Sequence, residues 1–185
     1  MKSLFALAAT ALLLTGCGQN GEDRGNRDAA SRPEAANPAA SAAGAAAAEL
    51  GKPVSGAQAK KLMHDRHEGM EEIGDAFTVA TREVKSNSPN LARLRQSAAV
   101  IARLAPHASG WFPPGTGPDV GKTRAKPEIW QKPRDFAAKA KAFPQAARAF
   151  SAAAQRGDIA AIRAAHADLG KACKACHDPY REPEH

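Results

Sequence analysis

Apolar residues recur at helical spacing along four stretches of the chain after residue 55. An apolar position every three or four residues lines one face of a helix, so each stretch predicts an amphipathic helix. The predicted helices cover 56–86, 89–108, 127–155 and 158–180. Their apolar positions include Met63, Met70, Phe77 and Val84 in the first, Leu94 and Ile101 in the second, Phe136, Phe143 and Phe150 in the third, and Ile162 and Leu169 in the fourth. Four such helices predict an all-α fold, an antiparallel up-down four-helix bundle.

Turn-forming residues mark the ends of these helices. Ser55 is expected to cap the first helix and Ser88 the second, with Pro89 at the first position of the second helix. A cluster of prolines and glycines follows the second helix and predicts a long loop from 111 to 126. Pro144 falls inside the third helix, where it removes a backbone donor and is expected to kink the helix.

The N-terminus has the pattern of an export signal. A short basic start is followed by an apolar run that is too short to span a bilayer, so residues 1–16 are interpreted as a lipoprotein signal peptide. The four residues ending at Cys17, Leu-Thr-Gly-Cys, resemble a bacterial lipobox, which implies that Cys17 is acylated. Cleavage as an ordinary secretory signal is the alternative. Both readings place the protein in the periplasm, and the first anchors it to a membrane through lipid.

Between this signal and the first helix lies a segment of low hydrophobicity. Residues 17–54 are rich in Ala, Gly and Pro and contain almost no large apolar side chain. Such a segment cannot bury enough surface to offset its ordering entropy, so we predict a disordered tether. The folded domain is therefore expected at 55–185.

The last predicted helix carries the run Cys-Lys-Ala-Cys-His at 173–177. This C-x-x-C-H motif indicates covalent haem c, because two thiols form thioethers with the haem and the next histidine ligates the iron. On a helix, Cys173, Cys176 and His177 share one face and present both sulfurs and the imidazole to one flat ligand. A redox dithiol and half of a zinc site are the alternatives for a C-x-x-C pair. The chain shows neither strand-like alternation nor a second cysteine pair, so one covalent haem c is predicted.

The formal net charge of +7 suits an acidic redox partner. Aromatic residues make up only 5% of the chain and do not alternate with the basic ones, so no nucleic-acid partner is expected. No nucleophile–base or carboxylate pair indicates an enzyme. His64 and His67 lie three residues apart and are expected to be exposed.

Several motifs of the domain resemble those of the cytochrome c' family, in the same order along the chain. They are Arg66-x-x-x-Met70, Phe-Pro-x-Gly-Thr at 112–116, Lys-Pro-Glu-Ile-Trp at 126–130, Gly157-Asp158, and the run from Cys173 to Arg181. The resemblance implies that Cys173 and Cys176 hold the haem and that His177 is the proximal iron ligand. It also implies that Arg181 lies near the proximal imidazole, and that dimers form through the first two helices.

The resemblance assigns the opposite, distal face of the iron to the first helix. Arg66 would neutralise a haem propionate, and Met70 would either ligate the iron or cover its open site. Met63 is the alternative ligand, because Lys-Leu-Met-His-Asp at 61–65 resembles the low-spin cytochromes c556, in which a methionine of this helix is the sixth ligand. Met70 is preferred because its spacing from Pro89 fits the family without an insertion. Simple core packing stays open for both methionines.

Two functions follow from these alternatives. With a methionine ligand, the protein is expected to carry electrons between redox partner proteins in the periplasm. With an open, five-coordinate iron, it is expected to bind nitric oxide, carbon monoxide or other diatomics instead.

Overall fold

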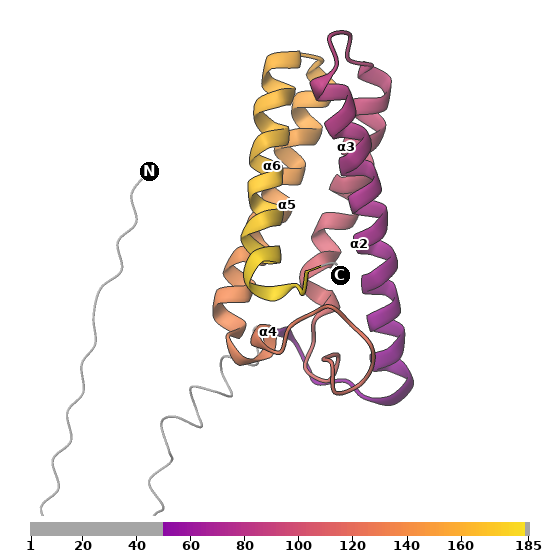
Figure 1. The fold of residues 1–185 in the computed structure, drawn as a ribbon, viewed down its shortest axis with the longest axis vertical. Coiled ribbons are helices and arrows are strands. Elements are labelled where there is room, and N and C mark those ends of the chain that lie inside the picture. The colour runs from indigo at the N-terminus through magenta and orange to yellow at the C-terminus, as the bar shows by residue number, and fades with distance from the viewer. Residues whose placement is uncertain (1–49, 184–185) are drawn as a thin grey trace, which may run out of the picture. The chain divides into compact units, whose positions relative to one another are not determined.

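The structure is a computed structural model that describes residues 50–183 (Figure 1). Its four long helices are α2 (Gly56–Lys85), α3 (Leu91–Leu104), α5 (Pro133–Arg156) and α6 (Ile159–Tyr180). The 3-10 helix η2 (Ala105–Trp111) continues from α3, and the short helix α4 (Glu128–Gln131) precedes α5. The predicted signal peptide, Cys17 and residues 17–49 of the predicted tether lie outside the described residues.

The four long helices run alternately up and down (Figure 1), which confirms the predicted all-α four-helix bundle. Within residues 50–183, extended backbone pairs only at an isolated bridge between Ala125 and Arg181. None of the helices in this part of the chain is long and apolar enough to span a membrane.

The core of the bundle combines a few large side chains with many alanines. Phe136, Phe143 and Phe150, which are seven residues apart on α5, are all buried and confirm the predicted apolar stripe. Burying one such side chain stabilises the fold by about 1.5–3 kcal/mol. Between the large residues lie alanines without any exposed surface, which let the helix backbones approach closely: Ala80, Ala98, Ala105, Ala147 and Ala154.

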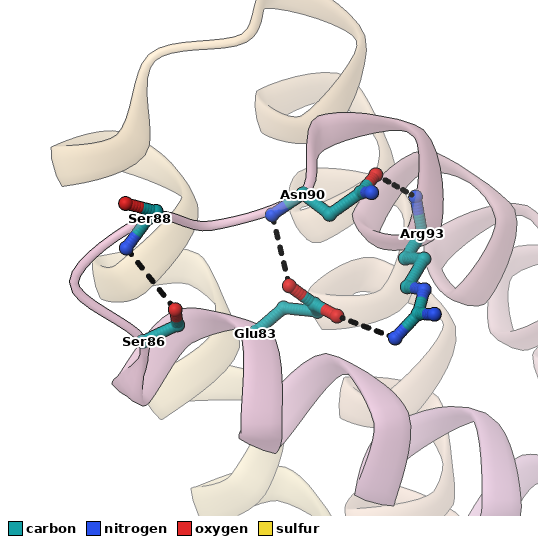
Figure 2. A network of polar contacts seen from close by, with 5 residues as sticks. All are labelled: Glu83, Ser86, Ser88, Asn90 and Arg93. Atoms are coloured by element: carbon teal, nitrogen blue, oxygen red, sulfur yellow. Dashed lines mark hydrogen bonds and ion pairs between the residues drawn. The ribbon is translucent and has the colours of Figure 1, made fainter.

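The connection between α2 and α3 differs from the prediction (Figure 2). The second helix begins at Leu91 and not at Pro89, and its cap is Asn90, whose side chain accepts a hydrogen bond of 3.1 Å from the backbone N–H of Arg93. Glu83 of α2 fixes this cap, because its carboxylate accepts the backbone N–H of Asn90 at 2.8 Å and pairs with the Arg93 guanidinium at 3.4 Å. Asn90 is hard to recognise in the sequence because Ser88 and Pro89 form an equally good local start signal.

This difference gives a direct test of which residue caps α3. We expect Asn90→Ala to lower the free energy of unfolding by about 1 kcal/mol, since the N–H of Arg93 loses its acceptor. Ser88→Ala is the matched control and should change it by less than about 0.5 kcal/mol, as surface substitutions usually do. Urea unfolding followed by circular dichroism measures both. A larger loss of unfolding free energy in Ser88→Ala than in Asn90→Ala would show that Ser88 caps the helix, as the sequence predicted.

The predicted helix 127–155 is divided at Lys132 into α4 and α5, and the α-helical part of the predicted helix 89–108 ends at Leu104, whereas the remaining helix ends follow the sequence closely. Ser55 is the N-cap of α2, although its side chain makes no capping hydrogen bond. Helix α5 ends at Gly157, which takes the left-handed conformation at φ 78°, and Asp158 caps α6 by accepting the N–H groups of Ala160 and Ala161. Helix α5 continues through Pro144 as one element, and the kink that we expected there stays a prediction.

Candidate haem site

The site is defined by the way in which α2 and α6 lie against each other. Arg163 donates from Nε to the carbonyl of Val84 at 2.9 Å, and one turn further along α6 the ring of His166 bonds the hydroxyl of Thr81 at 2.9 Å. Another turn on, Gly170 leaves room for Phe77, whose Cζ would lie 3.3 Å from a Cβ at that glycine. The two helices are therefore antiparallel neighbours with a fixed register.

Figure 1 shows α2 and α6 in the bundle, and the same register can be continued towards the C-terminal end of α6. A step of one residue towards the N-terminus of α2 corresponds to a step of one residue towards the C-terminus of α6. If the register continues unchanged, Met70 is expected level with His177, and Arg66 near the end of α6. This extrapolation is compatible with the predicted distal and proximal residues, which are on α2 and α6, and their roles at the iron stay a prediction.

The three residues of the C-x-x-C-H motif have the properties that haem attachment needs. The half-buried thiols of Cys173 and Cys176 pack against the core and form no disulfide. Burial raises the pKa of Cys173 to about 11 and also raises the pKa of Cys176, so both are protonated at neutral pH and resist adventitious oxidation.

The imidazole of His177 is neutral at physiological pH, as an iron ligand must be. Its side chain is exposed at the surface, yet desolvation by the surrounding protein lowers its pKa, and the positive charges of Arg181 and Arg124 lower it further. Arg181 thus lies close to the predicted proximal ligand. A role for this arginine at the iron stays a prediction.

The end of α6 that carries His177 is held in place by its neighbours. The buried phenol of Tyr180 donates a hydrogen bond to Asp135 of α5, and its ring packs edge-on against Phe136. Burial and the Asp135 carboxylate both raise the pKa of Tyr180, so the phenol stays protonated as a donor.

A second set of contacts joins the chain just after α6 to the loop 112–127. The backbone N–H of Lys126 donates to the carbonyl of Tyr180 at 3.0 Å, and the backbone N–H of Glu182 donates to the carbonyl of Arg124 at 2.8 Å. The guanidinium of Arg124 also donates to the carbonyl of Glu182, at 2.9 Å from Nη2. The last turn of α6 is therefore fixed on two sides, by α5 and by this loop.

Arg66 holds the same loop from the opposite helix. This side chain is only 5% exposed, and its Nη1 and Nη2 atoms donate to the carbonyl of Thr116 at 3.2 Å, while Nη2 also donates to the Thr123 hydroxyl at 2.9 Å. Its Nη1 reaches the carbonyl of Trp111 at 3.3 Å, and the cation lies over the ring of Phe112. Burial lowers the pKa of Arg66 to about 10, which still leaves it charged at pH 7. The contacts of Arg66 described here are with the loop, and its predicted contact with a haem propionate stays a prediction.

The two candidate methionines have different surroundings. Met70 is half-buried and packs against the core. Met63 lies about two turns lower on α2, beside Gly121 of the loop, where an added Cβ would come within 3.2 Å of the methyl of Met63. Met70 thus packs against the core and Met63 against the loop, and the preference for Met70 as the residue that faces the haem stays a prediction. Whether its sulfur binds iron stays a prediction.

Two parts of this site were not predicted from the sequence. The first is a notch at Gly69 that holds the ring of Trp111, since a Cβ on this glycine would come within 2.4 Å of the ring. The second is the pair Thr116 and Thr123, which supply hydrogen-bond acceptors to Arg66. A glycine in the middle of a helix can indicate such a close approach, so Gly69 was an available signal for the notch. No local sequence signal identified the two threonines as acceptors for Arg66.

The residues present fit a covalently bound haem c. Two free thiols stand at i and i+3 on one helix, a neutral imidazole follows at i+4, and the half-buried Met70 of α2 packs against the core. This fold and this motif together define a four-helix c-type haem protein. The sequence profile described as Cytochrome C' matches residues 61–181, and the chain belongs to the cytochrome c' family. Proteins of this family bind one covalent haem c, and the sequence contains one C-x-x-C-H motif.

Individual relatives agree with this assignment. The chain is similar to cytochrome c' from Alcaligenes xylosoxydans xylosoxydans, with 36% identity over 127 residues that cover 68% of this chain and 97% of that protein. It is 38% identical to cytochrome c' from Allochromatium vinosum over 95 residues, which cover 50% of this chain and 62% of that protein.

Solved structures show the same likeness in three dimensions. The crystal structure of cytochrome c' from Thermochromatium tepidum aligns with a TM-score of 0.62 and 32% identity, covering 68% of this chain and 97% of that one. A nitric oxide complex of a mutant cytochrome c prime from Alcaligenes xylosoxidans aligns with a TM-score of 0.62 and 32% identity, covering 70% of this chain and 99% of that one.

Proposed function

We propose that this protein is a lipid-anchored periplasmic electron carrier. The observation that carries the proposal is the half-buried Met70 of α2, which packs against the core and would offer a thioether as a second protein ligand to the iron. When bound, haem c supplies a one-electron couple, and methionine as an axial partner of histidine raises its potential.

The protein's own residues support this role in three ways. His177 is neutral at neutral pH and is therefore ready to ligate. Tyr180, through Asp135, keeps the turn that follows His177 from moving. The loop 112–127 is hydrogen-bonded both to Arg66 of α2 and to the end of α6, so it connects these two helices. A site that does not rearrange suits electron transfer, because little reorganisation accompanies a change of charge.

A second candidate function is the binding of diatomic ligands, chiefly nitric oxide, at a five-coordinate iron. The specific observation in its favour is that similar solved structures include cytochromes c prime from Alcaligenes xylosoxidans in complex with nitric oxide, at 32% identity. Met70 would then cover the open iron face without ligating it. Its neighbours on α2, Ile73 and Phe77, are apolar and would favour a small uncharged ligand over water.

The optical spectrum of the purified holoprotein separates the two candidates. If Met70 ligates, the reduced protein has a low-spin spectrum, Met70→Ala converts it to a high-spin spectrum, and Met63→Ala leaves it unchanged. A high-spin spectrum in the unmodified protein, together with uptake of nitric oxide, would exclude the methionine-ligated carrier and support the second candidate. The same conversion caused by Met63→Ala would assign the ligand to the other methionine.

The lipid anchor is proposed from the sequence around Cys17 alone. We expect Cys17→Ser to move the protein from the membrane fraction to the periplasmic fraction, because the acyl chains that hold it are no longer added. Haem content should stay the same, since Cys173 and Cys176 are untouched. Fractionation followed by immunoblotting measures this. Retention of the variant in the membrane fraction would contradict acylation at Cys17.

A further inference from the structure

A group of metal-ligating side chains lies on the outer face of α2, away from the haem site. His67, Glu68 and Glu71 are exposed, and each offers one ligand atom within 4.8 Å of the others. His67 Nε2 lies 3.3 Å from the Glu71 carboxylate. His64 joins the group from the preceding turn, with its Nδ1 atom 3.8 Å from the Glu68 carboxylate. The prediction that both histidines are exposed is confirmed.

The helix itself creates this arrangement. Residues three and four apart share one face, so two His–Glu pairs at i and i+4 interleave on a single stripe. The opposite face of α2 carries Arg66, Met70 and Ile73 into the bundle, which leaves the stripe free to face solvent. None of the four side chains is needed to cover the core.

The donor atoms suit a borderline divalent cation. Imidazole nitrogen and carboxylate oxygen together are typical ligands of Zn²⁺ and Cu²⁺, whereas Mg²⁺ and Ca²⁺ prefer oxygen alone. A tetrahedral ion with bonds of about 2.0–2.1 Å needs its ligand atoms roughly 3.3 Å apart, which is closer than the 4.8 Å observed. Rotation of exposed side chains closes this gap at little cost, because the solvated ion pairs that they leave contribute little.

Local charge favours a cation here despite the positive net charge of the chain. Asp75 lies one turn beyond Glu71 on the same helix and adds a carboxylate near the site, whereas Glu72 pairs with Arg103 of α3. Lys61 pairs with Asp65, while the exposed Lys60 places one positive charge a turn before His64. The carboxylates of Glu68, Glu71 and Asp75 therefore outnumber the one nearby lysine.

We propose that His67, Glu68 and Glu71, with His64 as the fourth ligand, form a surface site for one Zn²⁺-like divalent cation per chain. The site is separate from the haem and does not depend on the function proposed above. It would give the protein a second, non-haem metal in the metal-exchanging environment outside the cytoplasm.

Calorimetric titration of the chelator-treated holoprotein with zinc chloride tests this proposal. We expect one zinc ion per chain, and a loss of affinity of at least about tenfold in His67→Ala, since even outer-shell changes cost 10–100-fold. His107→Ala removes an exposed histidine of η2, outside the stripe, and should bind zinc like the unmodified protein. The haem spectrum and the thermal unfolding curve should be the same in all three proteins.

Three results would overturn the proposal, two of them obtained when zinc does bind. One is zinc binding that His67→Ala and Glu71→Gln leave unchanged, because the ligands then lie elsewhere. The other is a stoichiometry of one zinc per two chains, because the ion would then bridge two copies and would not sit in a single-chain site. Absence of any saturable binding would also exclude the site.

Discussion

Replacing both Cys173 and Cys176 by alanine will yield protein without covalently attached haem. The two thiols are the only cysteines of the folded domain, and both face the core from the last helix. His177 remains in the variant, so haem can still associate with the protein, but only through reversible contacts. We expect the mass of the denatured protein to fall by one haem and the haem stain on a denaturing gel to disappear.

The single variants and Cys17→Ser provide the matched controls. Cys173→Ala and Cys176→Ala each leave one thiol, so a reduced amount of attached haem is expected in both, while Cys17→Ser should keep the full amount. The double variant should also unfold at a lower temperature, because a ligand bound only by the folded state stabilises that state. Haem that survives denaturation in the double variant would disprove attachment at this motif.

Replacing Arg66 by methionine is expected to lower the free energy of unfolding by about 3 kcal/mol. The guanidinium is buried and donates to the carbonyls of Trp111 and Thr116 and to the hydroxyl of Thr123. Each buried acceptor that loses its donor costs about 1–3 kcal/mol, and methionine fills much of the vacated volume without donating. Chemical denaturation of the holoprotein, followed by far-ultraviolet circular dichroism, measures the loss.

Arg82→Met is the control, because this arginine is on the same helix and is exposed. It should change the free energy of unfolding by less than about 0.5 kcal/mol. Arg66→Lys keeps the positive charge but cannot reach several acceptors with one nitrogen, so an intermediate loss is expected. A loss below about 1 kcal/mol in Arg66→Met would mean that the loop 112–127 is held mainly by its other contacts.

The helices were predictable because their signals are local and repeated. The stripe of Phe136, Phe143 and Phe150 specifies the buried face of α5 within a single helix. Gly157 and Asp158 specify the turn that follows. That turn needs a residue in the left-handed conformation, followed directly by a side chain that caps the next helix. The C-x-x-C-H motif is equally local, so five consecutive residues are enough to predict that α6 binds the haem.

The contacts of the long loop could not be predicted, because they join residues far apart in the chain. Arg66 meets Thr116 and Thr123 across a gap of 50 and 57 residues, and their pairing depends on the path of a loop without regular structure. The prediction of the N-cap of α3 was wrong for a different reason. Ser88 and Asn90 both suit the N-cap position, and the choice between them falls to Glu83, which is on another helix.

The loop 112–127 limits where this bundle can be altered by protein engineers. Exposed loops usually accept inserted peptides and new chain termini. This loop is tied to α2 through Arg66 and to the end of α6 through Lys126 and Glu182, so an insertion there would disturb both walls of the cofactor pocket together. A reporter peptide or a circular permutation site is better placed between the exposed residues Asn87 and Ser88, at the opposite end of the bundle.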